Sequence, residues 1–114
     1  MKANGDCYEA AGRFMMDQCT FGSSCDLRLV HGEVMGQGPV EGITFGHAWI
    51  LDDRGMVIDK SNGRDVMLPE SIYYKAGQID SIDNVIEYSW DEARKKILEY
   101  GHWGPWDLET ASGY

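Results

Sequence analysis

Two residues that can do acid–base chemistry together, His47 and Asp59, flank a short stretch that is typical of a β-hairpin. Apolar residues dominate 44–51 and 56–59, and the residues between them, 52–55, have the composition of a tight turn. The two arms of such a hairpin run antiparallel, so we expect His47 and Asp59 to lie side by side at one end of a sheet. A carboxylate bonded to one ring nitrogen would fix the tautomer of His47 and leave the other nitrogen as a base.

Cys7 is the candidate nucleophile for this pair. Asp6 can cap a helix, and apolar residues recur at helical spacing from Cys7 to about Cys19, which places Cys7 in the first helical turn. A helix N-terminus favours a thiolate, and its free N–H groups can stabilise a developing oxyanion. With His47 as the base, the set predicts acyl transfer from an amide, ester or thioester through a thioester on Cys7.

The same three residues also have structural interpretations that the sequence leaves open. A free cysteine such as Cys7 is often simply buried. His47 can be a core histidine that donates to a carbonyl, and Asp59 can start a turn through its side chain. A second oxyanion donor is also required, and we assign Asn4 or Gln37 to that role as candidates.

The remaining pattern predicts one α+β domain over residues 1–114, with an antiparallel sheet packed against the first helix. The aromatic stretch 102–108 is expected to pack across the domain, with its tryptophans in the core. His31 and His102 are assigned surface or structural roles. The expected elements, in order, are a helix from Cys7 to about Cys19, a strand from Leu27 to Met35, the hairpin, a short extended piece from Asp65 to Leu68, a short helix from Glu70 to about Ala76, a strand from Asn84 to Tyr88, and a helix from Ser89 to Tyr100.

Composition narrows the classes of partner. The formal net charge of −9 argues against a nucleic-acid backbone or an anionic membrane as the main partner. It is compatible with small substrates, with basic proteins or with simple solubility. The partner that we expect is a peptide, protein or small amide substrate. No apolar run approaches the ~20 residues that cross a bilayer, and residues 1–6 do not have the pattern of a signal peptide. We therefore expect a cytoplasmic protein.

The number of cysteines also favours a cytoplasmic protein. Three cysteines fit a reducing compartment better than a disulfide framework, so we expect Cys19 and Cys25 to be reduced thiols, although the two can pair in principle. The chain has no CxxC or HExxH spacing, so we expect no metal site, and we assign no cofactor.

The ordered set of motifs resembles the papain-like superfamily of cysteine hydrolases. Its members closest to this chain are the transglutaminase-like proteins, which carry Cys, His and Asp in this order with an "HAW"-type strand and a "VxD"-type strand joined by a short turn. The corresponding stretches here are Gly5-Asp6-Cys7-Tyr8, Gly46-His47-Ala48-Trp49-Ile50 and Val57-Ile58-Asp59. The Asp6-Cys7 pair is also similar to the NlpC/P60 peptidases. The resemblance covers about residues 4–62 and implies a small papain-like domain with catalysis on Cys7, His47 and Asp59.

Two hypotheses of different class follow. The first is a small cysteine hydrolase or acyltransferase that acts on an amide or isopeptide-type bond through a Cys-His-Asp triad. The second is a binding or inhibitor protein without turnover, of the kind found among phage and mobile-element products, in which an acidic surface blocks a basic partner. The small size, the acidity and the aromatic tail motivate the second hypothesis.

Overall fold

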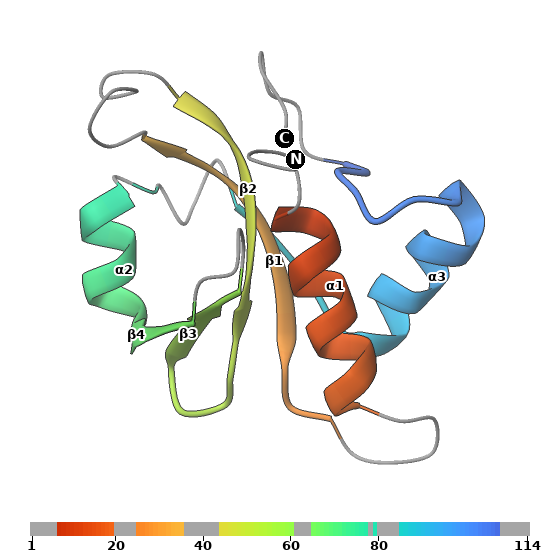
Figure 1. Cartoon of the computed structure of the whole chain (residues 1–114), viewed down its shortest axis with the longest axis horizontal. Coiled ribbons are helices and arrows are strands. Elements are labelled where there is room, and N and C mark those ends of the chain that lie inside the picture. Colours follow the sequence, from red (N-terminus) through yellow and green to blue (C-terminus); the bar gives the residue numbers. More distant parts are fainter. Residues whose placement is uncertain are drawn as a thin grey trace.

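The computed structural model describes residues 7–19, 25–35, 44–60, 65–77, 79 and 85–107, and these residues form an α+β fold (Figure 1). The order of elements expected from the sequence is confirmed, and the boundaries agree to within one residue or two. The elements are α1 (Cys7–Gln18), β1 (Arg28–Met35), β2 (Thr44–Leu51), β3 (Met56–Asp59), β4 (Val66–Pro69), α2 (Glu70–Gly77), β5 (Val85–Tyr88) and α3 (Trp90–Tyr100).

The strands form one antiparallel sheet in the order β4-β3-β2-β1-β5. β1 and β2 pair along their full lengths, from Arg28↔Leu51 to Met35↔Thr44. β2 and β3 pair next to the turn, at Ile50↔Ile58 and Leu51↔Val57. His47 and Asp59 therefore lie beyond the paired part of the hairpin.

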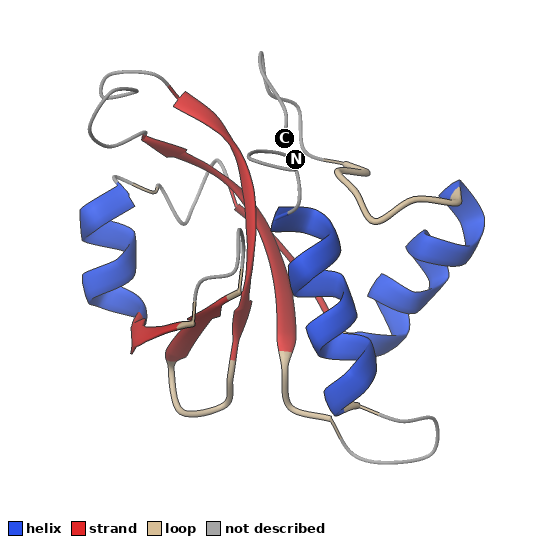
Figure 2. Ribbon diagram, in the orientation of Figure 1, coloured by secondary structure: helices blue, strands red, loops and turns tan. Residues whose placement is uncertain are grey.

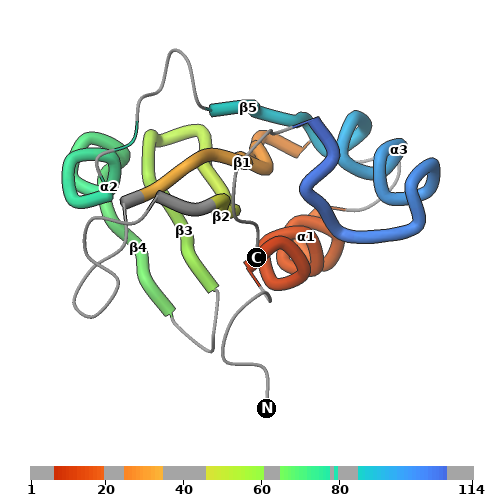
Figure 3. The backbone as a smooth tube through the Cα atoms, turned by 90° about the horizontal axis from the view of Figure 1, so that it is seen from above, coloured from red at the N-terminus to blue at the C-terminus, as the bar shows by residue number. Residues whose placement is uncertain are grey.

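Helices cover both faces of the sheet. α1 and α3 lie against one face and α2 against the other (Figures 2 and 3). Side chains along a strand alternate between faces, and the core divides accordingly. The α1 side includes Ala11, Met15, Leu29, Ala48 and Ile50. The α2 side includes Val30, Trp49, Val57 and Tyr74.

The segment after α3 packs across the α1 side of the sheet, as expected. Trp103 and Trp106 pack against the core of that side. His31 of β1 is fully buried there, with its ring centroid 4.8 Å from that of Tyr8, 5.1 Å from Tyr88 and 4.9 Å from Trp106. The tail thus closes over the start of α1 and the middle of β1.

The contact between α1 and this tail requires a glycine at position 12. A Cβ on Gly12 would lie 2.6 Å from Cε3 of Trp103, closer than carbon atoms pack. We expect Gly12→Ala to lower the free energy of unfolding by about 1–3 kcal/mol, because this overlap outweighs the roughly 1 kcal/mol that alanine gains over glycine in a helix. Urea unfolding measures the change. In a Trp103→Ala background the same substitution should be neutral or stabilising, and equal effects in both backgrounds would contradict the contact.

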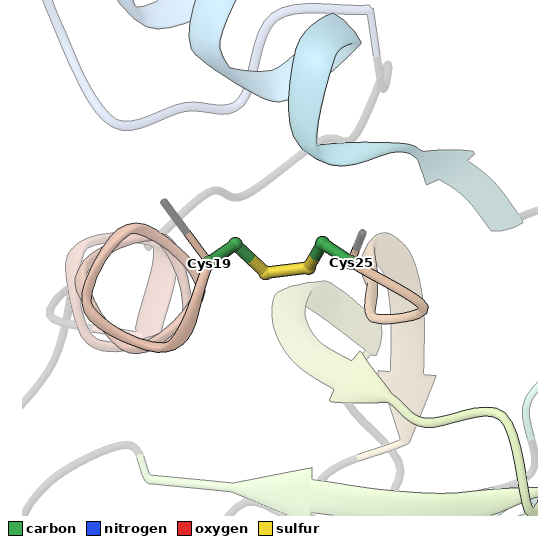
Figure 4. The surroundings of a disulfide bond; sticks show 2 residues. All are labelled: Cys19 and Cys25. Carbon is green, nitrogen blue, oxygen red and sulfur yellow. A yellow bond between two sulfur atoms is a disulfide. The ribbon is translucent and has the colours of Figure 1, made fainter. Parts of the chain in front are cut away.

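A disulfide joins Cys19, just after α1, to Cys25, ahead of β1 (Figure 4). The expectation of two reduced thiols was therefore wrong. The two Cα atoms lie 5.6 Å apart, which is within the usual range for a disulfide. Cys7 remains free and buried.

In the described part of the chain, no helix combines the length and the apolar character needed to span a membrane.

Candidate active site

Cys7 begins α1, as the helical pattern predicted, and is 3% exposed. α1 packs along β2 and β1, so its first turn lies against the sheet (Figure 1). Glu9 adds an acidic residue to this first turn, where the helix dipole favours negative charge. Because Cys7 belongs to α1, its sulfur is positioned by a helix and not by a loop.

His47 and Asp59 come from neighbouring strands and are hydrogen-bonded to each other. His47 Nε2 lies 3.1 Å from Asp59 Oδ2. The two residues are 8% and 1% exposed, respectively. Gly32 is the register partner of His47 on β1, so no side chain of that partner stands beside the imidazole. The contact expected from the hairpin is present, although it forms beyond the last paired residues of β2 and β3.

Cys7 is also close enough to His47 to affect the charge of its imidazole, so all three residues of the set interact. Burial by itself lowers the pKa of His47, but hydrogen bonds to Asp59 and Cys7, together with the negative charge of both, raise it to about 9. Asp59 takes Nε2, so Nδ1 is the ring nitrogen left for the sulfur. The imidazole is therefore favoured in its protonated form at neutral pH, between two groups that can carry negative charge.

Tyr73 is a member of the site that sequence reasoning missed. Its hydroxyl donates to Asp59 Oδ2 at 2.8 Å, the same oxygen that His47 contacts. The Trp49 ring packs near both residues, with its centroid 6.1 Å from that of His47 and 5.4 Å from that of Tyr73. The one available signal was a tyrosine pair, Tyr73-Tyr74, on the short helix after the hairpin, and nothing in its spacing connects it to Asp59.

The expected oxyanion donors, Asn4 and Gln37, lie outside the described residues. Two hollows among the described residues have volumes of ≈ 400 and ≈ 470 Å³. Residues such as Asp26, Asp52 and Glu87 line the first, whereas Glu92 and Lys96 are among those that line the second. Both hollows are separate from the Cys7–His47–Asp59 set.

Comparisons with protein-family models, with curated proteins and with solved structures give no match. What this chain can do is therefore inferred from the geometry of Cys7, His47 and Asp59. A thiol that interacts with an imidazole, which is in turn hydrogen-bonded to a buried carboxylate, has the arrangement of a nucleophile, a base and a group that orients the base.

Proposed function

We propose that the chain is a small cysteine hydrolase or acyltransferase that acts on an amide or isopeptide-type bond. The observation that carries this proposal is that His47 is hydrogen-bonded to the buried Asp59 and also interacts with Cys7 at the start of α1. An imidazole shared between a thiol at a helix N-terminus and a buried carboxylate favours the thiolate–imidazolium pair, which is the reactive state of a cysteine nucleophile.

The reaction follows from these positions. The Cys7 thiolate attacks the carbonyl carbon, and the backbone N–H of Cys7 is one donor to the resulting oxyanion. His47 transfers its Nδ1 proton to the leaving amine as the carbon–nitrogen bond breaks, which leaves a thioester on Cys7. Water, or an amine in acyl transfer, then attacks the thioester and gives a proton to His47. The acyl product leaves, and the thiolate–imidazolium pair is restored. Asp59 stays ionised throughout and holds the ring.

The papain-like, transglutaminase-like assignment is part of this proposal, as are a peptide, protein or small amide substrate and a cytoplasmic location. The chain order Cys7, His47, Asp59 and the antiparallel arms that carry His47 and Asp59 support the family assignment. The Cys19–Cys25 disulfide weakens the argument for a cytoplasmic location, because disulfides persist mainly in oxidising compartments.

The thiolate of Cys7 is the state to measure. We expect the ultraviolet absorbance of a thiolate at pH 6 in the wild type but not in Cys7→Ser. Cys19 and Cys25 do not contribute, because they are paired. An ordinary cysteine, with a pKa of about 8.5, is less than about 1% thiolate at this pH. Iodoacetamide should then label Cys7 at least about tenfold faster than it labels glutathione at pH 6.

His47→Gln is the matched variant for this measurement, because it removes the titrating ring and keeps a polar side chain. We expect it to abolish both the absorbance and the fast labelling. If the wild type carries no thiolate on Cys7 at pH 6, the thiolate–imidazolium pair on which the proposal rests is refuted.

The burial of Cys7 favours a second candidate function, a binding or inhibitor protein without turnover. At 3% exposed, Cys7 offers little surface to a substrate, while the net charge of −9 suits a basic partner. The two functions differ in what Cys7→Ala does. A binding protein keeps a stable complex with its partner in a pull-down with this variant, whereas an enzyme loses its turnover.

A further inference from the structure

We infer that Tyr73 is a positioning residue of this site, which acts on His47 through Asp59. The inference rests on the proposed function and extends it from three side chains to four. Its basis is that two donors converge on one oxygen: the Tyr73 hydroxyl at 2.8 Å and His47 Nε2 at 3.1 Å from Asp59 Oδ2.

The carboxylate of Asp59 needs such donors because it is almost completely buried. A charged carboxylate removed from water is costly unless hydrogen bonds replace its hydration. The Tyr73 hydroxyl is a neutral donor, so it stabilises the charge of Asp59 without competing for the proton that His47 exchanges with Cys7. Asp59 can therefore remain an anion beside the imidazole throughout the proposed reaction.

The position of the hydroxyl is set by packing as well as by the hydrogen bond. Tyr73 lies in α2, which begins at Glu70 immediately after β4, and β4 pairs with β3 at Asp59↔Val66. The ring of Tyr73 is also packed against Trp49, which in turn stacks on His47. Trp49 thus contacts both partners of Asp59, so the hydroxyl and the imidazole approach the carboxylate from fixed directions.

It follows that Tyr73 restrains the rotation of the Asp59 carboxylate. With Oδ2 held by the tyrosine, that same oxygen faces His47 Nε2, and the ring keeps Nδ1 toward Cys7. Without the hydroxyl, the ionised carboxylate of Asp59 loses one of its hydrogen-bond donors and can turn away from the imidazole. The hydrogen bond from the ring to the carboxylate is then weaker.

Tyr73→Phe tests this role, because it removes one oxygen and keeps the ring against Trp49. Tyr74→Phe is the matched control: it deletes the same group from the next residue of α2, which packs on Trp49 at 5.7 Å on the same side of the sheet. We expect Tyr73→Phe to slow the labelling of Cys7 by iodoacetamide at pH 6 by about tenfold. The free energy that a hydrogen bond to a charged group usually contributes corresponds to a factor of about this size. The acid limb of the labelling profile should also move to higher pH.

A spectroscopic measurement separates positioning from a general loss of packing. In the wild type, the Nε2 proton of His47 is protected by its bond to Asp59, and we expect Tyr73→Phe to raise its exchange rate with water, measured by NMR, at least threefold. Tyr74→Phe should leave both the exchange rate and the labelling rate within about twofold of the wild type. In an Asp59→Asn background, Tyr73→Phe should have no further effect on labelling, because Tyr73 acts through Asp59.

Failure of the inference and failure of the proposed function give different results. If wild-type Cys7 carries no thiolate at pH 6, the proposed function fails, and the Nε2 exchange rate still reports whether Tyr73 holds Asp59. If Cys7 is reactive and Asp59→Asn slows it, but Tyr73→Phe leaves the labelling and the exchange rate unchanged, the role of Tyr73 is refuted while the triad stands. Equal effects of Tyr73→Phe and Tyr74→Phe would refute it as well.

Discussion

Asp59→Asn is expected to slow the labelling of Cys7 at pH 6 by about 100-fold, at the lower end of what loss of a positioned acid–base group costs. The same variant should lower the pKa of His47 from its present value of about 9, because a hydrogen bond and a charge from Asp59 both contribute to that value. A carboxamide keeps the shape of Asp59 but carries no charge. It can also present its NH₂ group to Nε2 and so select the wrong tautomer.

Two measurements check this result: the rate of iodoacetamide labelling against pH, and the NMR titration of the His47 ring. Asp53→Asn is the control, because it makes the same change of charge on an exposed turn residue of the same hairpin. A His47 pKa that stays near 9 in Asp59→Asn would show that Asp59 does not set the charge of the imidazole. The proposed triad would then reduce to a Cys7–His47 pair.

Much of this fold could be predicted because its local signals are strong. The ends of α3 illustrate this, since Ser89 and Glu92 form the expected capping box and Gly101 ends the helix in the left-handed conformation, with φ of 74°. The hairpin is similar: the side chain of Asp52 accepts from the backbone N–H of Arg54 and of Met56, and Gly55 has a φ of 80°. In each case a few adjacent residues determine the geometry, and adjacent residues can be read from the sequence.

The contact between His47 and Asp59 was predictable for the same reason, because a tight turn brings the two arms of a hairpin together. The prediction simplified one point. The pairs Ile50↔Ile58 and Leu51↔Val57 adjoin the turn, and the two catalytic candidates lie beyond them. Their contact therefore depends on side chains that meet past the paired residues, and not on direct register.

Contacts between distant segments could not be predicted in this way. Tyr73 reaches Asp59 because α2 packs against β3 and β4, and no local pattern in the sequence records where that helix lies. The Cys19–Cys25 disulfide depends on how close Cys19, after α1, lies to Cys25, before β1, whereas the number of cysteines indicates only which cellular compartment is favoured. The surroundings of His31 are of the same type, since α1, β5 and the tail all contribute a ring to them.

Those surroundings give His31 a large expected effect on stability in acid. Neither ring nitrogen of His31 has a hydrogen-bond partner within the described structure, and the side chain is fully buried. Burial lowers the pKa of His31 to about 3, against the opposing charge of Asp107. Asp107 is itself occupied by the Tyr88 hydroxyl and by Lys96, so it does not neutralise a charged His31.

The sign of the pH dependence follows from the two states. In the unfolded chain His31 has its ordinary pKa of 6.5, whereas in the folded protein the value is about 3. Between these values the unfolded chain binds a proton that the folded protein does not bind. The contribution of His31 to stability is therefore complete above pH 6.5 and falls as the pH drops toward 3, by about 1.4 kcal/mol per pH unit.

We therefore expect the wild type to lose about 3 kcal/mol more stability between pH 6.5 and pH 4 than His31→Leu loses. Urea unfolding of both proteins at the two pH values gives this difference. The titration of aspartates and glutamates is common to both proteins and cancels. The absolute stability of the variant does not enter, because each protein is compared with itself.

His102→Asn is the control for this measurement, because it removes an exposed histidine of the same tail and keeps an acceptor in place of Nδ1, which bonds the N–H of Gly104. This variant should lose as much stability as the wild type between the two pH values. If His31→Leu also loses that much, His31 is not held neutral in the folded protein. The ring cage of Tyr8, Tyr88 and Trp106 would then have to admit a charged imidazolium, which buried aromatic rings can stabilise only when the ring faces approach the cation.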